Sequence, residues 1–164
     1  MNRAFAQART LNRHQLDPMK DTLLDTVTEE HATLEAFASL LAYEEKALTA
    51  VSPADTLPAI IEKKTELTEK LATLEKARDE QLRALGLPAG LKGMEIACAD
   101  DPRVAGTWKL LQEAVDRARR ANMTNGLMIR VRMNYNEKAL AILRGANKGG
   151  AASTYGPDGR MAGV

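Results

Sequence analysis

The sequence is poor in the residues on which strand-rich, disulfide-bonded and metal-binding proteins depend. Valine and isoleucine together number eleven of 164 residues, and aromatic residues make up 4%. Both values are too low for a domain built mainly of β-strands. Cys98 is the single cysteine, so the chain can form neither an internal disulfide nor a cysteine metal cluster, which fits a reducing cytoplasm. Nothing in the sequence places either histidine, His14 or His31, beside Cys98 as a catalytic base.

Other absences disfavour further classes of protein. No apolar run is long enough to cross a bilayer, and the N-terminus lacks the apolar core of a secretory signal. The chain contains no phosphate-binding glycine loop and no Glu-x-x-His helix motif. The arginines at 117, 119 and 120 lack the interleaved aromatics of a single-strand binder. These absences disfavour an enzyme, a cofactor or metal protein, and a nucleic-acid-binding protein.

The abundant residues are those of long helices. Alanine (27), leucine (21), glutamate (13) and lysine plus arginine (23) supply about half of the chain. The net charge of +1 conceals an asymmetry, because residues 21–101 carry eight basic and seventeen acidic side chains, whereas residues 102–164 carry eleven and four. The two parts can attract one another in a folded-back bundle. The acids, among them Glu30 and Glu44, are interpreted as members of solvated helix faces.

Hydrophobic spacing divides the chain into three helical segments. Apolar or seam positions recur in steps of three and four over 18–51, 57–85 and 102–144, as in a coiled coil. Asp17-Pro18 and Asp101-Pro102 are typical helix starts, and Gly86 is a typical C-terminal cap. A single helical turn is expected around 91–96. The spacing continues through Asn125-Gly126, which favours one long third helix over a hairpin bent at that dipeptide.

The predicted fold is all-α: an antiparallel three-helix coiled-coil bundle at 18–145, with an overhanging third helix. Residues 1–17 are interpreted as a disordered extension or as the result of an upstream start, with Met19 as the alternative first residue. Residues 146–164, rich in glycine and alanine, are expected to form a disordered tail. Apolar surface at the far end of the third helix would lack an internal partner and is a candidate binding site.

The functional interpretation depends on a few residues of scarce types in the third segment and the tail. Asn122, Asn125 and Asn136 occupy seam positions. A seam asparagine either fixes the register of the bundle or reads an incoming helix, and both roles stay open. The methionines at 123, 128 and 133 suit an adaptable surface or a core. Tyr155 lies in a glycine-flanked tail and is either incidental or an anchor for a partner pocket.

Two motifs together resemble a known family. The run NMTNGLMIRVRMNYNEKALAIL has the form Asn-x2-Asn-Gly followed by Asn-x2-Ala-Leu-x2-Leu, and a flexible linker leads from it to Tyr-Gly-x-Asp-Gly. This arrangement resembles the FlgN family of flagellar type III export chaperones over about residues 19–160. The arginine-rich N-terminal extension and the longer linker before Tyr155 depart from the family pattern.

The resemblance implies a bacterial cytoplasmic chaperone that acts transiently at the flagellar export apparatus and has no enzymatic activity, cofactor or metal. The implied cargoes are the hook–filament junction proteins FlgK and FlgL, and the implied further partners are the export gate protein FlhA and the stalk protein FliJ. Tyr155 and Gly156 are the residues expected to dock on the gate. The residues expected at the cargo surface are Asn122, Asn125, Gly126, Ile129, Met133, Asn136, Leu140 and Leu143.

Two alternatives remain beside this interpretation. One is a structural coiled-coil adaptor in which the seam asparagines set the register. The other is an unrecognised helical-bundle enzyme or nucleic-acid-binding protein. The oligomeric state is also open, because the third helix could pair with a second copy in a homodimer when cargo is absent.

Overall fold

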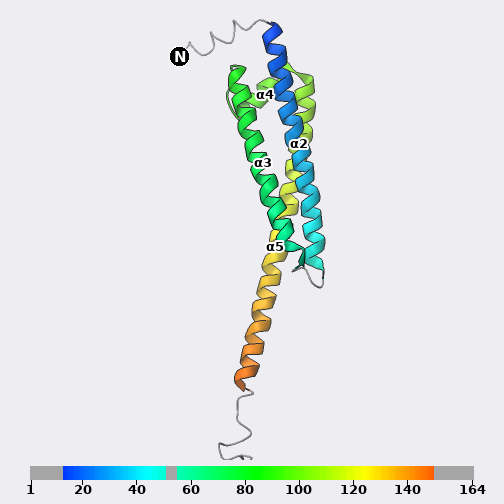
Figure 1. Ribbon diagram of the computed structural model, residues 1–164, viewed down its shortest axis with the longest axis vertical. Coiled ribbons are helices and arrows are strands. Elements are labelled where there is room, and N and C mark those ends of the chain that lie inside the picture. Colours follow the sequence, from blue (N-terminus) through cyan, green and yellow to red (C-terminus); the bar gives the residue numbers. More distant parts are fainter. Residues whose placement is uncertain (1–12, 51–54, 150–164) are drawn as a thin grey trace, which may run out of the picture. The chain divides into compact units, whose positions relative to one another are not determined.

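The computed structural model describes residues 13–50 and 55–149, with side chains placed within 15–50 and 55–145. Its elements are the helices α2 (Arg13–Thr49), α3 (Leu57–Ala84), α4 (Leu91–Asp100) and α5 (Pro102–Gly149), as Figure 1 shows. The all-α prediction is confirmed for the described residues. The three long helices have 37, 28 and 48 residues. α4, with ten residues, is longer than the single turn expected there.

The chain divides into two compact units, residues 1–125 and 126–164. The first unit contains α2, α3, α4 and the part of α5 that ends at Asn125, and the second contains the rest of α5. The helix is continuous at Asn125 and Gly126, so the bent hairpin is not observed. α5 also extends to Gly149, five residues beyond the predicted end of the third segment at Arg144.

The two Asp-Pro dipeptides play different roles. Asp101 caps α5 as predicted: its backbone is extended, and its Oδ1 accepts a hydrogen bond from the backbone N–H of Arg103 at 2.9 Å. Asp17 does not open α2, because this helix already includes Arg13 and carries Pro18 inside it. Pro18 is tolerated there because it is exposed and lies only six residues into the helix, where few backbone hydrogen bonds are lost. Helix α2 therefore begins five residues before Pro18, the first residue predicted for this helix.

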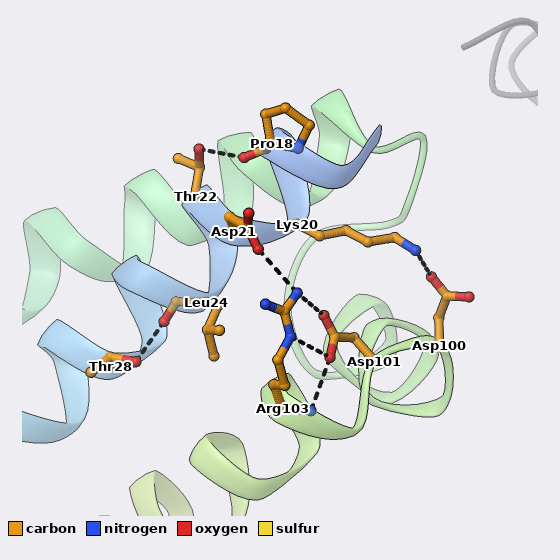
Figure 2. Close-up of polar contacts among 9 residues, drawn as sticks. All are labelled: Pro18, Lys20, Asp21, Thr22, Leu24, Thr28, Asp100, Asp101 and Arg103. Carbon is orange, nitrogen blue, oxygen red and sulfur yellow. Dashed lines mark hydrogen bonds and ion pairs between the residues drawn. The ribbon is translucent and has the colours of Figure 1, made fainter. Parts of the chain in front are cut away.

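Ion pairs join the start of α5 and the end of α4 to α2, as Figure 2 shows. Arg103 contacts both Asp101, at 2.9 Å, and Asp21, at 3.0 Å, and Lys20 pairs with Asp100. The hydrogen bond from the Arg103 side chain is the main cause that lowers the pKa of Asp101, and the Asp101 and Asp21 carboxylates raise the pKa of Arg103. Acidic α2 and basic α5 thus attract each other within the first unit, as the charge asymmetry suggested.

The core of the first unit follows the predicted seams. Within this unit α3 runs antiparallel to α2, and α5 runs in the same direction as α2 (Figure 1). Side chains spaced by three and four residues on α2 and α5 meet between the helices, and α4 closes one end with Met94. The buried hydrophobic cluster comprises Leu23, Val27, Leu34, Leu41, Leu82, Met94, Ala97, Val104, Leu111, Ala114 and Ala118.

Gly86 ends α3 in the manner that the sequence predicts. Its φ of 75° lies in the left-handed region, which glycine adopts without a steric penalty. Its N–H donates to the carbonyl of Arg83, and the N–H of Leu87 donates to the carbonyl of Leu82, both at 2.9 Å. These bonds satisfy carbonyls at the end of the helix and turn the chain toward α4.

A second glycine, Gly93, allows α4 to approach the loop before it. A Cβ atom at this position would lie 1.8 Å from the carbonyl oxygen of Pro88 and 3.2 Å from a methyl group of Leu82. We expect Gly93→Ala to lower the free energy of unfolding by about 2 kcal/mol, because backbone must shift to admit the methyl group. Chemical denaturation measures the change.

Gly106 provides the matched control for this substitution. It lies in α5, and a Cβ atom there would meet nothing within 4 Å. Gly106→Ala is therefore expected to raise stability by up to about 1 kcal/mol, because alanine loses less entropy than glycine in a helix. Equal effects of the two substitutions would show that α4 does not need a close approach at Gly93.

Candidate functional site

A buried ion pair lies between α2 and α3. Nη1 of Arg78 donates to both carboxylate oxygens of Glu30 at 2.6 Å, and the Arg78 guanidinium lies 5.0 Å from the ring centroid of Trp108. Only 5% of Glu30 and 7% of Arg78 are exposed. Burial raises the pKa of Glu30, and the Arg78 charge opposes this shift. The interpretation of Glu30 as a member of a solvated face was wrong.

A second buried polar cluster joins all three long helices. Nδ2 of Asn125 donates to Oε2 of Glu44 and to the backbone carbonyl of Leu41, each at 2.8 Å. Lys64 of α3 pairs with the same Glu44 carboxylate at 3.0 Å. Glu44 is 3% exposed and Asn125 is 1% exposed, so Glu44 is also not a solvated residue. The cluster connects α2, α3 and α5 at the end of the first unit.

The spacing of these two clusters sets the register of the bundle. Glu30 and Glu44 are fourteen residues apart on α2, and their partners Arg78 and Lys64 are fourteen residues apart on α3. Fourteen residues are two heptads, so both acids face the same seam of an antiparallel pair. On the parallel side, Asp21 faces Arg103 and Glu35 faces Arg117, with the same offset of 82 residues.

Asn125 therefore differs from the other residues expected at the cargo surface. Its side-chain amide is used inside the bundle and is not displayed on the surface of this structure. Of the two roles that the sequence left open, this contact favours the fixing of register. Asn122, one turn earlier, is exposed.

The remaining expected cargo residues lie on one side of α5. We call the apolar set Ile129, Met133, Leu140 and Leu143 face one; its members are between 36% and 63% exposed. Asn136 is exposed on the same side, and Gly126 is half-buried. Spacings of four, seven and three residues keep the set on one stripe of the helix. Face one has the form of a coiled-coil seam without a partner.

A second apolar stripe was missed by the sequence analysis. We call Leu127, Val131, Tyr135 and Ile142 face two; they are between 56% and 74% exposed. At 3.6 residues per turn, faces one and two lie on nearly opposite sides of the helix, roughly 160° apart. The sequence does contain its signal, a second apolar series spaced by four, four and seven residues beside the predicted seam.

The helix between and around these faces is basic. Residues 126–145 contain four basic side chains and one acidic side chain, Glu137. The basic residues are Arg130, Arg132, Lys138 and Arg144. Such a charge favours an acidic partner, since opposite charges speed association and select among partners.

The other candidates do not form a chemical site in the described part of the chain. Tyr155 and Gly156 lie outside the described residues. Cys98 is a half-buried free thiol whose pKa is raised by burial. Within the described residues, 13–50 and 55–149, no three His, Cys, Asp or Glu side chains gather as metal ligands. No helix in these ranges is long and apolar enough to span a membrane.

Comparisons with known proteins identify the family. The family model described as FlgN protein matches residues 19–163. The chain belongs to the FlgN family. A flagella synthesis protein FlgN from Yersinia enterocolitica serotype O:8 / biotype 1B (strain NCTC 13174 / 8081) is 25% identical over 145 residues, which cover 88% of this chain and 92% of the relative. A second FlgN, from Yersinia enterocolitica, is 27% identical over 132 residues, covering 80% and 83%. No solved structure matches.

Membership of the FlgN family decides between the broad classes that the sequence left open. FlgN proteins are flagellar chaperones and not enzymes, so the chain has a role in flagellum biogenesis and export. The match includes the whole of α5 and extends into the tail that contains Tyr155.

Proposed function

We propose that this FlgN protein binds the terminal helices of the hook–filament junction proteins FlgK and FlgL in the cytoplasm. It prevents their premature assembly and delivers them to the flagellar export gate. Face one of α5 is the binding element. The observation that carries the proposal is the exposure of Ile129, Met133, Leu140 and Leu143 on one stripe of a helix.

The physical basis is the pairing of incomplete coiled coils. An amphipathic helix that is unpaired before assembly exposes apolar surface and tends to aggregate. Face one supplies a seam of matching form, so that both apolar surfaces leave water together. Release requires no chemistry, because a competing partner that binds either surface more tightly displaces the other.

The tail has a separate role in this proposal. Tyr155 and Gly156, joined to α5 by a glycine- and alanine-rich stretch, dock on the cytoplasmic part of the gate protein FlhA. A tyrosine provides a large contact area at a low entropy cost. Binding of the cargo-free chaperone to the stalk protein FliJ allows it to be used again.

A structural adaptor is the second candidate, and one observation favours it. Asn125 is bonded within the bundle, as expected of an asparagine that sets register in a structural coiled coil. In this case face one would pair with a second copy of the chain, and the protein would be a stable homodimer without cargo.

Co-purification with FlgK and FlgL from the same organism, followed by mass measurement, tests the proposal. We expect the 17.9 kDa chain to form a complex with each cargo. The triple variant Ile129→Ala, Met133→Ala, Leu140→Ala should weaken the affinity at least about tenfold, through loss of apolar contact area. Ile61→Ala, which truncates an exposed apolar side chain on α3, is the control and should bind as the wild type does.

Two further measurements test the role of the tail and the alternative of a structural adaptor. Tyr155→Ala should reduce binding to FlhA and leave both cargo affinities unchanged. If the wild-type chain is a homodimer and remains one in the presence of either cargo, the result would instead support the adaptor. Equal cargo binding by the triple variant and Ile61→Ala would contradict the role of face one.

A further inference from the structure

Face two is an apolar surface that a single cargo helix on face one leaves uncovered. One packed helix buries a stripe of about 100° on its partner. The two faces are roughly 160° apart at 3.6 residues per turn, so one helix cannot cover both. Tyr135 and Ile142 on face two are 74% and 71% exposed, more than any member of face one. A second packing partner is therefore required if this surface is to leave water.

The charge of the segment argues against a second copy of itself as that partner. Residues 126–145 carry four basic side chains and one acidic one, so two such segments packed together would repel. The described part of the acidic first unit of another copy, residues 15–50 and 55–125, offers no matching stripe either. Its exposed large hydrophobics are dispersed over four helices: Tyr43, Ile61, Leu91, Ile96, Leu110 and Met123.

We propose that face two binds a second acidic amphipathic helix of the same cargo, so that residues 126–145 form the central helix of a three-helix assembly. Leu127, Val131 and Tyr135 make the apolar contact, and the basic residues beside them pair with acids that flank the cargo seam. This inference rests on the proposed function, since it assigns a second contact to the same cargo.

Affinity measurements on the full-length chain with purified FlgK and FlgL test the inference. The variant Leu127→Ala, Val131→Ala, Tyr135→Ala removes face two and retains helix-forming residues. We expect it to weaken cargo binding at least about tenfold, as the equivalent change on face one does. Arg130→Lys, which keeps the charge between the two faces, is the control and should bind as the wild type does. Helix content and thermal midpoint should be unchanged, since the three side chains are exposed.

Thiol labelling provides a readout that does not depend on these truncations. In a Cys98→Ser background, Val131→Cys reports on face two and Met133→Cys reports on face one. Bound cargo should slow alkylation of both thiols at least about tenfold, because each is covered by a helix. Slow labelling at 133 with unchanged labelling at 131 would overturn the inference and leave the proposed function intact.

The failures of the two proposals are distinguishable. If the wild-type chain binds neither cargo, the proposed function is refuted and the inference with it. If face-two truncation leaves affinity unchanged while face-one truncation reduces it, the inference alone is wrong. If truncation of face two converts a homodimer of the free chain into monomers, face two serves self-association and the inference is also wrong.

Discussion

Arg78→Ala is expected to lower the free energy of unfolding by about 3–5 kcal/mol, because it leaves the Glu30 carboxylate buried without its counter-charge. Glu30 is 5% exposed, and its two oxygens accept hydrogen bonds from Arg78. The substitution also removes the contact between the guanidinium and Trp108. Urea denaturation of the variant and the wild type measures the difference.

The pH dependence of this loss follows from the pKa of Glu30. Burial already raises that pKa, and removing Arg78 removes the charge that opposes the shift. The unfolded carboxyl group then ionises at a lower pH than the folded one, so the variant loses stability as the pH rises above about 4.5. The difference from the wild type should be largest near neutral pH and smaller near pH 4.

Two control variants distinguish the loss of the buried ion pair from the effect of removing a charge anywhere on the protein. Lys63→Ala removes an exposed ion pair with Glu66 and should change stability by less than about 0.5 kcal/mol. The double variant Glu30→Leu, Arg78→Met should be close to the wild type, because an apolar pair needs no charge compensation. An effect of Arg78→Ala no larger than that of Lys63→Ala would show that Glu30 is not buried as an ion.

Asn125→Asp is expected to lower the free energy of unfolding by about 3 kcal/mol, because it buries a second carboxylate beside Glu44. The asparagine amide donates to the Glu44 carboxylate and to the Leu41 carbonyl, and an aspartate can only accept from such groups. The new charge meets two acceptors at hydrogen-bond distance in a site that is 1% exposed. Thermal and urea unfolding at neutral pH measure the loss.

Asn122 offers the matched control, because Asn122→Asp makes the same chemical change at an exposed position of α5. This control should alter stability by less than about 0.5 kcal/mol. Glu44→Gln combined with Asn125→Asp should recover part of the loss, since the glutamine amide can donate to the aspartate. A loss of the same size for both aspartate variants would contradict the buried contact.

The helices and the core of the first unit could be predicted because their signals are local. Val27, Leu34 and Leu41 on α2 follow the three–four spacing and are buried, as are Val104 and Leu111 on α5. Asp101 and Gly86 each act within their own helix end, so the residue type and its neighbours were sufficient. The predicted start of α2 at Pro18 was wrong, because a proline near the start of a helix can also lie inside the helix, as Pro18 does.

The buried acids could not be read from their own segment. Glu30 and Glu44 resemble surface glutamates until Arg78 and Lys64 are placed opposite them, 48 and 20 residues away in the sequence. Lys64 and Arg78 do occupy seam positions, and a charged residue in a seam requires a partner of opposite charge. Face two was not predicted for another reason: Val131, Tyr135 and Ile142 each lie two residues after a member of face one, so they form a second stripe outside the predicted seam.

The paired charges of α2 and α3 also have a consequence for how the chain folds. A hairpin that closes seven residues out of step can still match some apolar residues, such as Leu34 with Leu67 and Leu41 with Ile60. Such a hairpin would set Arg78 against Leu23 or Phe37, and Glu30 against Leu71 or Leu85. Each charge would then be buried without compensation, at several kcal/mol per ion. The buried charges therefore disfavour mispaired hairpins relative to the native register.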